Sequence, residues 1–159
     1  MYIQLLYMKE IKKLLKSNAD IPLAKASIIN IFHTAMWVKD EILLQLKPYD
    51  LSIEQFNVLR ILRGQKGNPI NLQDIQERMV SKMSNTTRLV DKLIKKGFVD
   101  RNICPTNRRK VEIIITKKGL NALKEVDPIV EATENSLTNN LTHEELEQLN
   151  KLLITLKNK

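Results

Sequence analysis

The residues best suited to a chemical task are the lysines and arginines between Lys82 and Lys118. This segment of 37 residues holds eleven basic side chains against three acidic ones, so its net charge equals the +8 of the whole chain. The other residues balance, with 15 basic and 15 acidic side chains. The excess charge is therefore local and attracts a polyanion. Because guanidinium and ammonium groups bind phosphate oxygens, nucleic acid is the expected class of partner.

Length and composition indicate a folded protein. The 159 residues suit one domain, or a compact domain with an appended helical region, and 43% apolar and 28% charged residues are ordinary values. No apolar run approaches the roughly 20 residues of a membrane span, so no membrane partner is expected. The first residues, MYIQLLYMKEIKK, are apolar before they are basic, the reverse of a signal peptide, which favours the cytoplasm. Either Met1 or Met8 is the native start.

Residues for metal binding or catalysis are sparse. Cys104 is the only cysteine, and His33 and His143 are the only histidines, so no zinc site is visible. A metal sensor built from carboxylates and one histidine stays an alternative. The chain has no glycine-rich phosphate loop, no nucleophile elbow and no His and Cys at usable spacing. We expect no cofactor, no metal and no enzyme activity.

Hydrophobic spacing predicts a long helix over about Leu23 to Leu46, apolar on more than one side, which indicates a subunit interface in addition to its own core. Ser52 with Gln55 forms a capping box for a short helix, and Asn71 can cap another. A third helix is predicted from Ser84 to Lys96, with apolar residues on one face and basic residues on the other. It would position much of the excess charge.

Two β-rich runs, Phe98 to Ile103 and Lys110 to Thr116, flank a turn and predict a β-hairpin. Its three consecutive isoleucines, Ile113 to Ile115, indicate that both faces are partly covered. Thr116 can cap the next helix, in which Pro128 predicts a kink or a break.

Thr142 and Glu145 form a capping box for the last predicted helix. The expected fold class is therefore mainly α with a small β-hairpin (α+β).

Four strings now resemble a known family: LSIEQFNVLRIL, NLQDIQERM, SNTTRLVDKLIKKGFVDR and TNRRKVEIIITKKG. Their order resembles the MarR family of bacterial winged-helix transcription regulators, and the last two strings are the specific ones. The resemblance implies a winged helix-turn-helix lobe at 51–119. It also implies a dimerisation region formed by helices at 1–50 and 120–159.

A protein of this kind is expected to bind double-stranded DNA as a homodimer. The resemblance implies a palindromic operator, half-sites roughly 34 Å apart, repression of transcription, and release by a small-molecule effector.

The resemblance places one set of DNA contacts at the start of the third predicted helix, the recognition helix. Arg can pair with guanine and Asn with adenine, although a solvated helix face is the plain alternative. Thr86 faces either DNA or the edge of the core. Lys92, Lys95 and Lys96 either bind phosphates or solubilise the end of the helix. The contact residues predicted here are Lys82, Ser84, Asn85, Thr86, Thr87, Arg88 and Lys92.

The second set lies in the turn of the hairpin, which is the wing. By resemblance Arg109 enters the minor groove, with Asn107, Arg108 and Lys110 beside it. The family usually has Asp at the position of Asn107, and an amide cannot form a bidentate ion pair with arginine. We expect a looser wing, with Asp100 as the nearest residue that could compensate.

Three further alternatives stay open. His33, Met36, Trp37 and Phe56 either line an effector pocket or pack in a dimer interface. Cys104, near wing arginines, could make the protein a thiol-based redox sensor. The basic face could also dock an acidic protein or RNA.

Overall fold

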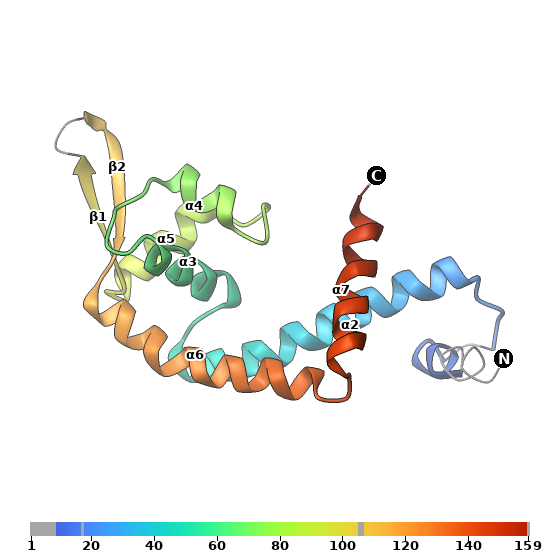
Figure 1. Cartoon of the computed structure of the whole chain (residues 1–159). Coiled ribbons are helices and arrows are strands. Elements are labelled where there is room, and N and C mark those ends of the chain that lie inside the picture. The colour runs from blue at the N-terminus through green and yellow to red at the C-terminus, as the bar shows by residue number, and fades with distance from the viewer. Residues whose placement is uncertain (1–8, 17, 105–106, 159) are drawn as a thin grey trace. The chain divides into compact units, whose positions relative to one another are not determined.

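The computed structural model of the chain describes residues 9–16, 18–104 and 107–158, and the side chains at 104 and 107–110 are not among the described ones. Met1 and Met8, the two candidate starts, lie outside the described residues. The chain divides into two compact units, Met1–Glu41 and Ile42–Lys159. The second unit therefore holds both the segment predicted as the lobe and the C-terminal helices (Figure 1).

The first unit consists of a helix at residues 9–14 and most of α2, which spans Leu23–Leu46. The predicted bounds of this long helix are confirmed. Ile11 and Ala26 are buried within the unit, whereas most of the large apolar side chains of α2 are exposed. Leu46, at the end of α2, belongs to the core of the second unit.

Two short helices of the lobe begin at predicted caps. After η1 (Lys47–Tyr49), α3 spans Ile53–Gly64, and both hydrogen bonds of the capping box between Ser52 and Gln55 are present. Helix α4 spans Leu72–Arg78, and Asn71 accepts a hydrogen bond from the Asp74 amide while the Asp74 carboxylate accepts one from the Asn71 amide. These bonds satisfy backbone amides that have no partner inside the helix.

The third short helix, α5, spans Thr86–Lys95 and so begins two residues later than predicted. The reason is Asn85, which is itself the N-cap: its side chain accepts a hydrogen bond from the Arg88 amide. Just beyond the C-terminal end of α5, Gly97 has a φ of 73°, and its amide donates a hydrogen bond to the Ile94 carbonyl. Glycine adopts this left-handed conformation without steric cost, as expected for a helix C-terminus.

The predicted hairpin is confirmed. Strand β1 (Val99–Cys104) pairs antiparallel with β2 (Asn107–Ile115), with Val99 opposite Ile115. Ile70 adds a bridge to the other edge of β2, since its amide and carbonyl both bond to Ile113. Ile113 and Ile115 are buried and Ile114 is half-buried, so the isoleucine run is covered on both faces to different degrees.

Helix α6 spans Lys117–Thr138 with Thr116 as its N-cap. Pro128 lies inside this helix, so the predicted alternative of a break between two helices is wrong. Gly119 permits the close approach of α6 to the hairpin, because a Cβ atom there would lie 2.3 Å from the Phe98 carbonyl oxygen. Helix α7 spans His143–Lys157 and begins with the predicted capping box.

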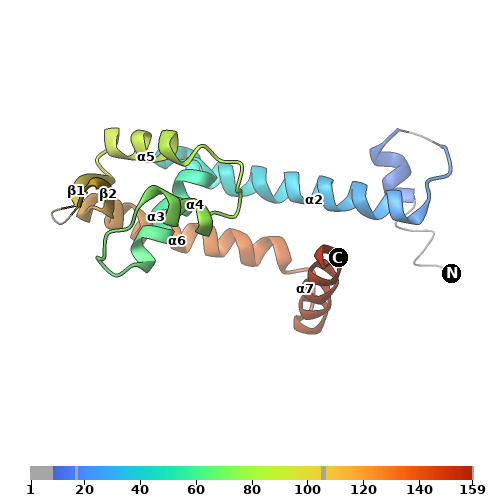
Figure 2. The ribbon, with the colours of Figure 1, turned by 90° about the horizontal axis from the view of Figure 1, so that it is seen from above.

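The core of the second unit collects residues from every element of the lobe and from α6. In both views the hairpin projects from one side of the helices α3, α4 and α5 (Figures 1 and 2). The fold class is mainly α with a small β-hairpin, as predicted. Among the described residues, none of the helices combines the length and the apolar character that crossing a membrane requires.

Candidate nucleic-acid interface

Helix α5 has two distinct faces. Val90 and Leu93 are completely buried against the core, whereas Arg88, Lys92 and Lys95 are exposed. Within the part of the chain that the structure describes, none of these three cations has an ion-pair partner. The exposed face therefore presents uncompensated positive charge on a helix of ten residues. A helix of this kind fits the major groove of DNA.

The amino end of α5 is chemically specific. The Asn85 Oδ1 accepts a hydrogen bond from the Arg88 amide at 3.0 Å, which leaves the Asn85 NH₂ group as a donor. A bidentate contact with adenine needs both Oδ1 and the NH₂ group. Asn85 therefore caps the helix with one lone pair of Oδ1 and keeps its NH₂ group available to donate to a base or a phosphate oxygen.

The neighbours of Asn85 differ in exposure. Thr86 is only 4% exposed and its hydroxyl donates to the Ser84 carbonyl at 3.5 Å, so it faces the edge of the core. We therefore remove Thr86 from the predicted contacts. Ser84 is half-buried, and Thr87 is exposed next to Arg88. The available side chains at this end are those of Asn85, Thr87 and Arg88.

The turn before α5 contains Lys82, whose ammonium group donates to the Glu77 carbonyl at the end of α4. The side chain is exposed, so its charge still contributes to the local field. This hydrogen bond holds the Lys82 side chain against the end of α4.

The sequence left two surface roles open for Lys96, phosphate binding or solubilising the end of the helix, and the structure shows a third role. Its ammonium group donates to the Asp50 backbone carbonyl, lies 3.0 Å from the Asp50 carboxylate and lies 3.3 Å from Gln55 Oε1. The Lys96 carbonyl in turn accepts from Lys118, whose ammonium lies 5.3 Å from the centre of the Phe98 ring. These two lysines connect parts of the lobe to one another and add less to the open basic surface.

An ion pair that the sequence did not suggest joins α5 to the hairpin. The Arg101 guanidinium lies 2.8 Å from the Asp91 carboxylate, and both side chains are partly exposed. Asp100, proposed as the residue that supports the wing, is exposed and forms no ion pair among the described residues. The opposite charges of Asp91 and Arg101 were visible in the sequence. Their proximity depends on the chain reversal at Gly97.

The predicted wing contacts Asn107, Arg108, Arg109 and Lys110 lie in β2. Their side chains, like that of Cys104, lie outside the described residues. The backbone register shifts between Ile103 and Cys104, where the hairpin approaches its turn. The roles of the wing arginines, of Asn107 and of Cys104 therefore stay predictions.

The predicted effector residues fall in two units. His33, Met36 and Trp37 lie on the part of α2 that belongs to the first unit, and all three are exposed. Phe56 belongs to the second unit, where it is 3% exposed in the core and the Arg60 guanidinium lies 5.5 Å from its ring centre. Among the described residues, no group of three or more His, Cys, Asp or Glu could hold a metal ion.

This arrangement of helices and hairpin was compared with known proteins. Residues 51–111 match the model of the MarR family. This segment is a MarR family domain. The chain is a winged-helix transcriptional regulator. The match coincides with the segment from α3 to β2, which contains the basic face of α5 and most of the hairpin.

Two relatives and one solved structure illustrate the similarity. The uncharacterized HTH-type transcriptional regulator YfiV of Bacillus subtilis is 38% identical over 70 residues, or 44% of this chain, and the match spans only 42% of that protein's length. The multiple antibiotic resistance protein MarR of Escherichia coli is 28% identical over 142 residues, covering 87% of this chain and 96% of that protein. A crystal structure of mutant E. coli MarR complexed with operator DNA has a TM-score of 0.75 at 24% identity, covering 88% and 100% of the two chains.

Proposed function

We propose that this MarR family protein is a repressor that binds a palindromic operator in double-stranded DNA as a homodimer. The observation that carries the proposal is the exposed face of α5, where Arg88, Lys92 and Lys95 have no ion-pair partner within the described residues. The same fold occurs in the E. coli MarR structure that was solved with operator DNA. Because it acts on genomic DNA, its proposed compartment is the cytoplasm.

The residues of α5 divide into two kinds of contact. Arg88 lies in the first turn and can form two hydrogen bonds with guanine, while Asn85 and Thr87 beside it can contact a base edge or a phosphate. Lys92 and Lys95, one and two turns further along, suit phosphates, which carry no sequence information. Arg108, Arg109 and Lys110 of the wing are proposed to extend this contact along the minor groove.

Homodimerisation is supported by apolar surface on the helices outside the lobe. On α7 no residue is buried, and the apolar side chains of Leu152, Ile154 and Leu156 are each more than half exposed. On α2 the side chains of Phe32 and Met36 are likewise exposed. Several large exposed apolar side chains on one helix are typical of an interface in a soluble protein. A second copy of the chain is the proposed partner for both helices.

Release by a small molecule completes the proposal. His33, Met36 and Trp37 are exposed on α2 and are available to line a pocket in the dimer. An effector needs only to favour the dimer geometry in which the two copies of α5 do not fit the half-sites. Trp37 is the only tryptophan, so its fluorescence reports directly on a ligand at this place.

The test is selection of bound sequences from a random duplex library with the full chain, followed by titration of the enriched sequence against random DNA. We expect a palindromic sequence, bound about 10³-fold or more tightly than random DNA. Sedimentation at micromolar concentration should show a dimer. A selection that enriches no DNA sequence, or a monomer at micromolar concentration, would overturn the proposal.

A further inference from the structure

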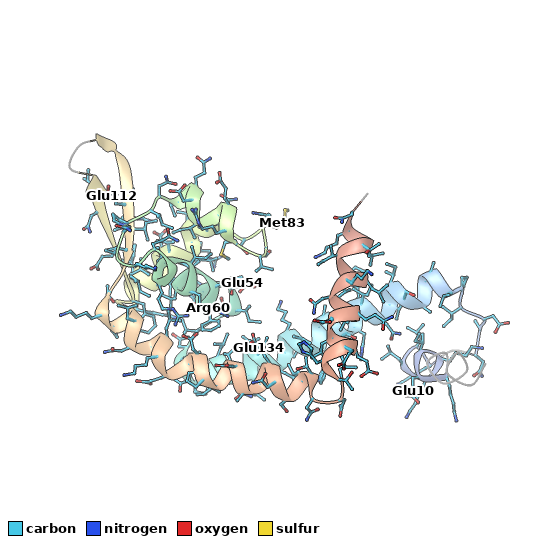
Figure 3. All side chains as sticks on the ribbon, in the orientation of Figure 1. Glu10, Glu54, Arg60, Met83, Glu112 and Glu134 are labelled. Atoms are coloured by element: carbon cyan, nitrogen blue, oxygen red, sulfur yellow. The ribbon has the colours of Figure 1, made fainter. Side chains whose placement is uncertain are left out.

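The turn between α4 and α5 displays two apolar side chains to solvent. Met83 is 95% exposed and Val80 is 87% exposed, the highest values among the large apolar side chains of the described residues. Figure 3 shows Met83 at the outer edge of this turn, with its sulfur directed away from the helices. Unlike the apolar residues of α2 and α7, these two lie beside the basic face of the lobe.

The turn is held in place at both ends. Met79 is buried at the C-cap of α4, and Thr86 is buried at the start of α5, so the backbone between them is anchored twice. Within the turn the Ser84 amide donates to the Ser81 carbonyl. Lys82 is directed back toward α4 by its bond to the Glu77 carbonyl. Met83 is therefore presented by a defined structure, and its neighbour does not cover it.

The position of Met83 determines what it can meet. It lies two residues before Asn85, the N-cap of α5, and residues at this end of a recognition helix contact base edges in the major groove. Thymine alone among the bases offers an apolar group there, its C5 methyl. Methionine is unbranched, with three rotatable bonds, and adapts its shape to such a contact.

We propose that Met83 recognises the C5 methyl group of a thymine in each half-site. The inference rests on the proposed operator binding and adds a specificity-determining residue to it. Val80 is as exposed but follows Met79 directly at the end of α4, five residues before the N-cap. The proposal assigns no base contact to Val80, which makes it the matched control.

Deoxyuridine tests this contact because it differs from thymine only by the missing methyl group. In the operator obtained by library selection, each thymine is replaced in turn by deoxyuridine and the affinity of the full chain is measured. One position in each half-site should lose about fourfold, the effect of one buried methyl group. Met83→Ala should bind the thymine and deoxyuridine operators equally, whereas Met83→Leu and Val80→Ala should keep the fourfold difference.

The outcomes separate this inference from the proposed function. An operator bound equally well with thymine and deoxyuridine at every position overturns the role of Met83 and leaves operator binding intact. Loss of the difference in Val80→Ala but not in Met83→Ala also overturns it. A selection that enriches no DNA sequence overturns the proposed function, and the inference with it. Met83→Ala should fold normally because the side chain is almost entirely exposed, and circular dichroism checks this.

Discussion

Helices α5 and α7 have similar sequence patterns, each with apolar residues at helical spacing and charged residues between them, yet they differ in what they bury. Helix α5 buries Thr86, Val90 and Leu93 in the core of the lobe. Helix α7 buries no residue: the apolar side chains of Leu152 and Leu156 are 59% and 57% exposed. An apolar stripe on a helix therefore predicts that the helix packs against a partner, but it does not specify which one. For α5 the partner is the same chain, and for α7 we propose a second copy.

The largest effect should come from the buried face of α5. Leu93→Ala removes a side chain that is completely buried, and it should lower the free energy of unfolding by about 2 to 5 kcal/mol. Because the core of the lobe comes from one chain, the loss should not depend on protein concentration. Urea denaturation at two protein concentrations measures both. A loss that vanishes at high concentration would mean that α5 depends on a partner chain.

The effect of Leu152→Asp on α7 should depend on protein concentration, unlike the effect of Leu93→Ala. The substitution should weaken the dimer by about 4 kcal/mol, because each subunit loses one buried leucine worth about 2 kcal/mol, which is roughly 10³-fold in the dissociation constant. Analytical ultracentrifugation over a range of concentrations gives this constant. Asn150→Asp introduces the same charge on the same helix at an exposed polar position about half a turn away from Leu152, and it is the control. Equal dimer strength in Leu152→Asp and wild type would contradict the proposed role of α7.

The exposed face of α5 should affect DNA and leave stability unchanged. Arg88→Ala should weaken operator binding by roughly 1 to 3 kcal/mol and random DNA by less, because a base-edge contact carries sequence information. Fluorescence anisotropy with both DNAs measures the difference. Lys124→Ala removes an exposed cation of α6 outside the basic segment and should have little effect. Equal weakening on both DNAs would place Arg88 among the phosphate contacts.

The wing can be compared with α5 by salt dependence. Arg109→Ala should reduce the slope of log affinity against log salt concentration by about 2, because the homodimer loses one phosphate contact at each of its two wings. Titrations at four salt concentrations provide the slope. If Asn107 leaves the wing too loose for contact, the slope of the variant will match that of the wild type.

The smallest expected effect concerns the ion pair between α5 and β1. Since Asp91 and Arg101 are partly exposed, breaking the pair should cost only about 0.2 to 1 kcal/mol of stability. A double-mutant cycle with Asp91→Ala and Arg101→Ala isolates this coupling energy. A coupling energy indistinguishable from zero would show that the pair does not help to hold the hairpin against α5.

Local features of the fold were predictable because their causes are local. Ser52, Asn71 and Thr142 each hydrogen-bond to a backbone amide three residues later, so the start of α3, α4 and α7 depends on a few adjacent residues. The start of α5 was misplaced by two residues for a related reason. Ser84 and Asn85 are both good caps, and only the backbone conformation decides that Asn85 caps the helix.

Contacts between distant residues were not predictable in the same way. Lys96 meets Asp50 across 46 positions of sequence, and its charge alone suited a phosphate equally well. Thr86 has a polar side chain typical of a surface, yet the angle of α5 on the core buries it. Met83 carried no signal in the sequence, since an apolar residue between two helices is normally buried.

Sequence alone establishes the order of the helices, most of their caps, the hairpin, the concentration of charge between Lys82 and Lys118, and the resemblance to the MarR family. These follow from residue type and spacing, which act over a few residues at a time. Which cations remain available depends on packing: Lys96 and Arg101 are paired with acids, whereas Arg88, Lys92 and Lys95 have no such partner within the described residues. Lysines and arginines are chemically similar, but each occupies a different place in the fold, so packing determines which of them lie beside an acid and which do not.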